Sequence, residues 1–198
     1  MTTFPYKNVL LGALLAAGLP LAVVAADQPD PHNPSPRIAA QRAAMAPLAK
    51  LDGHWRGTAT IVLPSGETRT LVQTERVGSF LDGSIKVIEG RGYDAEGNID
   101  FNAFAIVSFD PAKQAYNFRS YAHGRSGDFK FKPTDDGFQW EIPAGPATIR
   151  YTATIADGHW REVGERIVPG QAPVRMVTLD LQRIADSDWP AAGAVPKE

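Results

Sequence analysis

The sequence predicts an all-β protein: a closed antiparallel up-and-down barrel of about ten strands, preceded by one short N-terminal helix. Between Trp55 and Ile184, short segments of alternating apolar and polar residues recur about ten times, as expected for strands with one buried face. Turn sequences such as Asp94-Ala95-Glu96-Gly97-Asn98 and Asp157-Gly158 separate these segments. Gly, Asp and Asn readily adopt the backbone angles of tight turns, so each separator predicts a reversal of the chain.

Residues 1–26 have the pattern of a signal peptide. Lys7 precedes an apolar run from Val9 to Val24, and Val24-Ala25-Ala26 offers small residues for cleavage before Asp27. The run is short for a bilayer core of about 30 Å and contains Pro20, so we expect cleavage rather than an integral membrane anchor. The chain has no Cys, which excludes a lipoprotein anchor. We therefore expect a soluble exported protein, periplasmic or secreted.

The rest of the chain predicts one domain. Residues 27–36 are rich in Pro and polar residues and predict a disordered linker. Ser35-Pro36 is a helix-start signal, and the helix that follows is expected to break at Pro47. This helix either packs against the barrel or acts as a lid on one of its mouths. The barrel domain, helix included, is expected over residues 37–184, and residues 185–198 form an irregular tail in which Trp189 contacts the surface.

The strands are expected within the barrel domain at the following positions: 54–63, 67–77, 84–93, 99–109, 114–123, 128–132, 138–142, 147–155, 159–168 and 174–184. Glycines within strands, such as Gly90 and Gly164, predict sharp coiling.

Charged residues on the outer faces, including Arg69, Lys86 and Arg150, argue against an outer-membrane barrel. The net charge is −2, and no basic stripe is present, so we expect no nucleic-acid partner.

Three stretches resemble known proteins. Leu48-x-x-Leu51-x-Gly53-x-Trp55-x-Gly57 resembles the Gly-x-Trp opening of the calycins, the superfamily of lipocalins and fatty-acid-binding proteins. Together with Val107 to Tyr116 and Leu179 to Arg183, it resembles a bacterial family of exported proteins known only as a domain of unknown function. The resemblance implies a lipocalin-like barrel and no catalytic residue. It also implies that Arg183 stacks on the Trp55 indole and donates to free backbone carbonyls at the closed end.

The strand expected at 114–123 carries the main candidate site. One face presents Asn117, Arg119, Tyr121 and His123, and the other presents Tyr116, Phe118, Ser120 and Ala122. If the polar face points inward, the Arg119 guanidinium and the Tyr121 hydroxyl can grip a carboxylate. Arg119 would then need a ligand anion or an internal carboxylate, either Glu89 or Glu162. If the apolar face points inward, the polar face meets water. Tyr151 is a further candidate for the barrel interior.

These residues lead to one main functional hypothesis and several alternatives. The main hypothesis is a barrel that binds a small apolar or amphipathic molecule, and the Arg119 and Tyr121 pair extends it to an anionic one. An enzyme is the first alternative, because Glu89, Glu162 and His123 could form an acid/base set. A structural envelope protein with a filled barrel is the second. The histidines have no metal-ligand spacing, so no metal site is expected. Some calycin-like barrels bind haem through one histidine, which makes His123 or His159 a candidate axial ligand.

Overall fold

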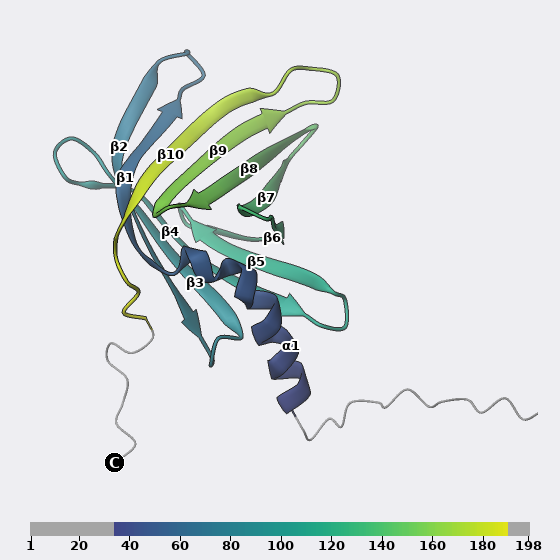
Figure 1. Cartoon of the computed structure of the whole chain (residues 1–198). Coiled ribbons are helices and arrows are strands. Elements are labelled where there is room, and N and C mark those ends of the chain that lie inside the picture. The colour runs from purple at the N-terminus through teal and green to yellow at the C-terminus, as the bar shows by residue number, and fades with distance from the viewer. Residues whose placement is uncertain (1–33, 190–198) are drawn as a thin grey trace, which may run out of the picture.

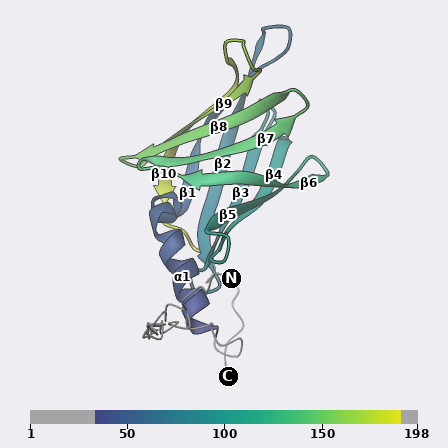
Figure 2. The same cartoon turned by 90° about the vertical axis from the view of Figure 1, so that its right-hand side faces the viewer.

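The computed structural model describes residues 34–189 and confirms the closed barrel of ten antiparallel strands (Figures 1 and 2). Each strand pairs with its neighbours in sequence, and β1 pairs with β10 to close the ring. The strands are β1 (Gly53–Val62), β2 (Thr68–Phe80), β3 (Ile85–Tyr93), β4 (Ile99–Asp110), β5 (Ala115–Ala122), β6 (Arg125–Pro133), β7 (Gly137–Ala144), β8 (Ala147–Ala156), β9 (His159–Ile167) and β10 (Val174–Ala185).

The predicted signal peptide, residues 1–26, lies outside the described residues, as do residues 27–33 and 190–198. Within residues 34–189, no helix has the length and apolar composition needed to cross a membrane.

A short helical segment covers one end of the barrel, which we call the closed end (Figures 1 and 2). Helix α1 (Ser35–Met45) begins after Pro34, which is its N-cap, so Ser35 is not the cap that the sequence suggested. The 3₁₀ helix η1 (Ala46–Leu51) then contains Pro47, at the expected break. Met45, Leu48 and Leu51 are buried in the same core as Trp55. The segment therefore both packs on the barrel and fills its closed end.

Several strands are longer than the sequence predicted, and the largest extensions are in β2, β6 and β7. β2 continues to Phe80 because Gly78, Ser79 and Phe80 pair with β3, so the expected loose connection shrinks to a turn. β6 begins at Arg125, since His123 and Gly124 make a two-residue turn with positive φ angles of 51° and 72°. Such turns match the twist of antiparallel hairpins, which lets pairing start immediately after them.

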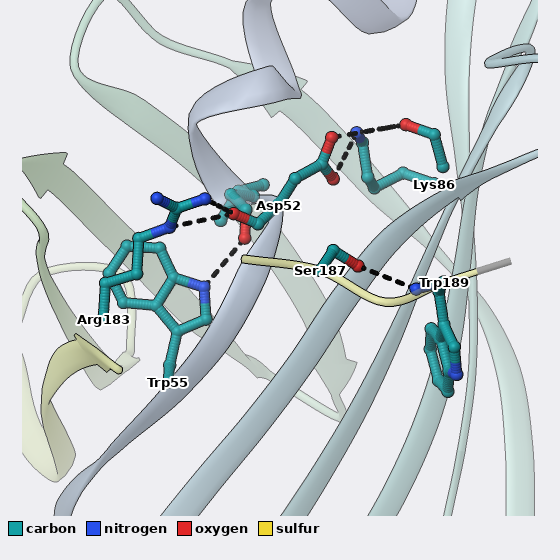
Figure 3. Close-up of polar contacts among 8 residues, drawn as sticks. Asp52, Trp55, Lys86, Arg183, Ser187 and Trp189 are labelled. Atoms are coloured by element: carbon teal, nitrogen blue, oxygen red, sulfur yellow. Dashed lines mark hydrogen bonds and ion pairs between the residues drawn. The ribbon is translucent and has the colours of Figure 1, made fainter. Parts of the chain in front are cut away.

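Asp52 connects three elements at the closed end (Figure 3). Its carboxylate accepts a hydrogen bond of 2.6 Å from the Lys86 ammonium, which also donates to the Ser79 hydroxyl at 2.7 Å. Lys86 is 1% exposed, so its expected position on the outer face is wrong. The Asp52 carbonyl oxygen accepts two hydrogen bonds from the Arg183 guanidinium, at 3.1 and 2.8 Å. The end of η1 is thereby tied to β3 and to β10.

Trp55 lies at the centre of this end and is 1% exposed. Its indole Nε1 donates to the carbonyl of Leu51 at 2.8 Å, and its ring meets Trp160 edge-on at 5.7 Å between centroids. Arg183 is its register partner on β10 and binds a backbone carbonyl as the resemblance implied. The expected stack of Arg183 on Trp55 is not among the cation–π contacts of residues 34–189.

Trp189 holds the start of the tail against the outside of the barrel, as the sequence suggested. Its ring meets Phe80 at 5.6 Å between centroids, and the Arg76 guanidinium lies 4.2 Å from the centroid of the indole.

Replacing Trp55 by Ala should lower the free energy of unfolding by about 3–5 kcal/mol, because a large buried aromatic and its hydrogen bond are lost. Urea denaturation measures this loss. Trp189→Ala is the matched control, since Trp189 packs on the outer surface, and its cost should be about 1 kcal/mol. Equal losses in the two variants would contradict the placement of Trp55 in the core.

Candidate functional site

The barrel encloses a cavity of about 600 Å³, and all ten described strands contribute to its lining. Most of the lining is apolar or aromatic. Small residues such as Ala59, Ala103 and Ala122 point inward and leave the space open. His123 and Arg125, both exposed, lie at the mouth opposite the closed end. The interior is thus filled at one end and hollow toward the other.

Glu75 on β2 brings a carboxyl group into this cavity. It shares the inward face with Leu71, Gln73 and Val77, and it is only 8% exposed. The Gln73 amide donates to its Oε1 at 2.7 Å. Gly90 lies directly opposite on β3, where a Cβ would stand 2.7 Å from the Glu75 carboxyl. The missing side chain at Gly90 therefore provides the space that this carboxyl occupies.

Glu162 on β9 is the second carboxyl in the cavity and is 5% exposed. The Trp140 indole donates to its Oε1 at 3.0 Å, and the Trp160 indole donates to its Oε2 at 3.2 Å. Tyr151 lies beside it, with its ring stacked on Trp140 at 4.2 Å between centroids. The structure thus confirms that Glu162 and Tyr151 lie inside the barrel.

Burial dominates the electrostatics of these groups. It raises the pKa of Glu75 to about 8 and the pKa of Glu162 to about 7, although the hydrogen bonds from Gln73 and from the two indoles act in the opposite direction. The negative charges of Glu162 and Glu89 raise the Glu75 pKa further. Burial and the charge of Glu162 raise the pKa of Tyr151 to about 12. No Lys, Arg or His within residues 34–189 forms an ion pair with Glu75 or Glu162.

Of the two orientations that the sequence left open, the structure has the polar face of β5 pointing outward, so Arg119 and Tyr121 form no carboxylate grip inside the barrel. Arg119 pairs with Asp128 at 2.6 Å and donates to the Tyr121 hydroxyl at 2.9 Å, and its side chain is 46% exposed. Phe118, from the other face, is buried in the core. Burying Phe118 removes apolar surface from water, whereas burying Arg119 would carry the cost of desolvating a charge.

Glu89 also lies outside the cavity. Its neighbours on β3, Ile88 and Gly90, line the cavity, and the Glu89 carboxylate accepts a hydrogen bond from Arg91 Nε at 3.1 Å. Its expected pairing with Arg119 does not form, since each of the two residues has a different partner.

Neither His123 nor His159 forms a hydrogen bond or an ion pair with Glu75 or Glu162. His123 lies at the mouth with its ring 5.3 Å from that of Phe101. His159 lies on the outer face of β9, where its Nε2 is 2.7 Å from an Asp180 oxygen. The acid/base set of Glu89, Glu162 and His123 is therefore not brought together. Across residues 34–189, no group of three or more His, Cys, Asp or Glu side chains is arranged to hold a metal ion.

Sequence reasoning missed Glu75, Gln73 and the two indoles that bind Glu162. A signal for Glu75 was present, because Leu71 and Val77 share its face at period two and are both apolar. For Trp140 and Trp160, the sequence offers no indication that both indoles donate to one carboxyl.

No protein-family model matches this chain, and no curated protein matches it. The closed ten-stranded antiparallel barrel with its short helix is compatible with a calycin-like fold.

The two buried acids should make the protein less stable as the pH rises from about 5 to about 8. In the unfolded chain they release their protons near pH 4.5, whereas the folded state holds them to about 7 and about 8. The folded state thus binds more protons in this window, and the free energy of unfolding falls with pH, by up to about 1.4 kcal/mol per pH unit for each acid.

Urea denaturation across this window measures the slope. Glu75→Gln should flatten it, while Glu141→Gln, on the outer face of β7 beside Arg150, should leave it unchanged. A slope that is identical in wild type and Glu75→Gln would show that Glu75 ionises normally in the folded protein.

Proposed function

We propose that the barrel binds a small apolar or amphipathic molecule in its cavity. The observation that carries the proposal is the cavity itself, about 600 Å³ with a mostly apolar and aromatic lining. Small-molecule sites are typically about 300–1,000 Å³ and combine such a lining with a few polar groups. Here the polar groups deep in the cavity are Gln73, Glu75, Tyr151 and Glu162.

The resemblance to the calycins supports the same function, since lipocalins and fatty-acid-binding proteins are barrels that hold small molecules. We further propose that residues 1–26 are a signal peptide and that the protein acts outside the cytoplasm, as a member of the exported bacterial family that its motifs resemble. An anionic ligand has less support than the sequence suggested, because Arg119 and Tyr121 lie on the outside of the barrel.

A second candidate function is an enzyme that acts on a small molecule in the same cavity. The observation in its favour is Glu162, a buried carboxyl with a pKa raised to about 7. General acids and bases work best with a pKa near the operating pH. A structural barrel with a filled interior has less support, because the cavity exceeds the lower limit of about 300 Å³ for ligand sites. For haem, His123 at the mouth is the one histidine of residues 34–189 that lines the cavity.

Native mass spectrometry of protein purified from its own compartment, before and after solvent extraction, tests the proposal. A carrier should show an added mass that extraction removes. Protein that carries no added mass and binds no apolar dye would exclude cavity binding. Conversion of the extracted molecule on renewed incubation with the protein would favour the enzyme.

Filling the cavity should abolish binding. Ala103 lines the cavity, so Ala103→Trp should lower the affinity for Nile red, a neutral fluorescent dye, by about tenfold or more. Asn102→Trp is the matched control, because Asn102 is the exposed neighbour of Ala103 on β4. Equal dye affinity in both variants would place the dye outside the barrel.

A further inference from the structure

When its two acids are ionised, the deep part of the cavity contains more hydrogen-bond acceptors than donors. Three N–H groups point to the acids, from Gln73, Trp140 and Trp160, and each is already used by Glu75 or Glu162. Gln73 is 2% exposed and Glu75 is 8% exposed, yet Gln73 Oε1 and Glu75 Oε2 accept no hydrogen bond from any residue between 34 and 189.

These two oxygens face open space rather than protein. Among the described residues, no fully enclosed side-chain nitrogen or oxygen lacks a partner. Gln73 and Glu75 both line the cavity, so their free acceptors reach its interior. Buried acceptors require donors, and the donors that remain at this depth, the Tyr151 hydroxyl and the second N–H of Gln73, carry no charge.

We propose that the ligand of this cavity carries a basic nitrogen, and that its protonated head donates to Glu75 and Glu162 while its apolar part lies along the aromatic lining. This inference rests on the proposed binding function and specifies its ligand class. An ammonium group has several N–H donors and no acceptor, which complements the acceptors of the cavity. It also supplies the positive charge that the two carboxyls lack.

The charged and titratable groups around the two acids favour a ligand with a basic nitrogen. Tyr151 from β8 is neutral, and Glu89 from β3 adds negative potential at Glu75. Arg125 and His123 lie at the mouth, from the β5–β6 turn. The depth of the cavity is therefore negative when the acids ionise, while the cations remain at the rim. An anionic head group would meet like charge where an ammonium group meets opposite charge.

Binding a cation should release protons. In the empty barrel burial keeps the two carboxyls protonated near neutral pH, and each carboxyl that pairs with an ammonium group loses its proton to solvent. The affinity for a cation should therefore rise with pH from about 6 to about 8.5, since an alkylammonium stays protonated to about pH 10.

Isothermal titration calorimetry with three probes of equal chain length tests the inference: octylamine, octanol and octanoate. Octylamine should bind at least about ten times more tightly than octanol, and octanoate should bind most weakly of the three. Titrations in two buffers of different ionisation enthalpy should reveal proton release for octylamine alone. This part of the test uses the wild-type protein and does not depend on any variant.

Variants then locate the head group. Glu75→Gln and Glu162→Gln should each reduce octylamine affinity by about tenfold and leave octanol affinity unchanged. Glu141→Gln, on the outer face of β7 beside Arg150, is the control and should bind all three probes as wild type does.

The outcomes separate the two proposals. Octanol or octanoate binding as tightly as octylamine overturns the basic-ligand inference and leaves cavity binding intact. Octylamine preference that persists in both cavity variants also overturns it, because the cation then binds elsewhere. If none of the three probes binds and Nile red does not bind either, the proposed binding function fails together with the inference.

Discussion

The pairing of β1 with β10 is the constraint on which the rest of the structure depends. It turns an open meander into a ring, so the inward side chains face one another or the cavity. The strands come so close at Gly57 that a Cβ there would stand 2.0 Å from the Asp180 carbonyl oxygen. Only glycine fits at that contact, so one position without a side chain permits the closure.

The same ring becomes hollow because its inward residues change in size along the axis. Trp55, Val77, Val107 and Leu181 fill the closed end, where the helical segment adds its own apolar side chains. Toward the mouth, inward positions carry alanine, serine and glycine instead. The polar links from Asp52 to Lys86 and Arg183 fix the helical segment over the filled end (Figure 3). Access to the interior is thereby limited to the opposite end.

The sequence predicted the fold well because alternation and turn chemistry are local signals. It predicted all ten strands, and errors were confined to ends such as Phe80 and Arg125, where pairing depends on the partner strand. The site was less predictable. β5 has aromatic residues on both faces, so its orientation follows only from its register with β4, in which Val107 opposes Phe118. From the sequence alone, Gly90 predicted only sharp coiling of its strand. That it makes room for the Glu75 carboxyl can be recognised only once the pairing of β3 with β2 is known.

The contrast between Lys86 and the two cavity acids explains how this interior tolerates charge-bearing groups. Lys86 is 1% exposed, and its ammonium has a carboxylate at 2.6 Å and a hydroxyl at 2.7 Å. Glu75 and Glu162 are nearly as buried but have only neutral donors. A carboxyl can avoid the cost of a buried charge by holding its proton, and the raised pKa values of both acids express this. The barrel can therefore fold around these two acids without a cation beside them, and a ligand that enters the cavity can supply that charge.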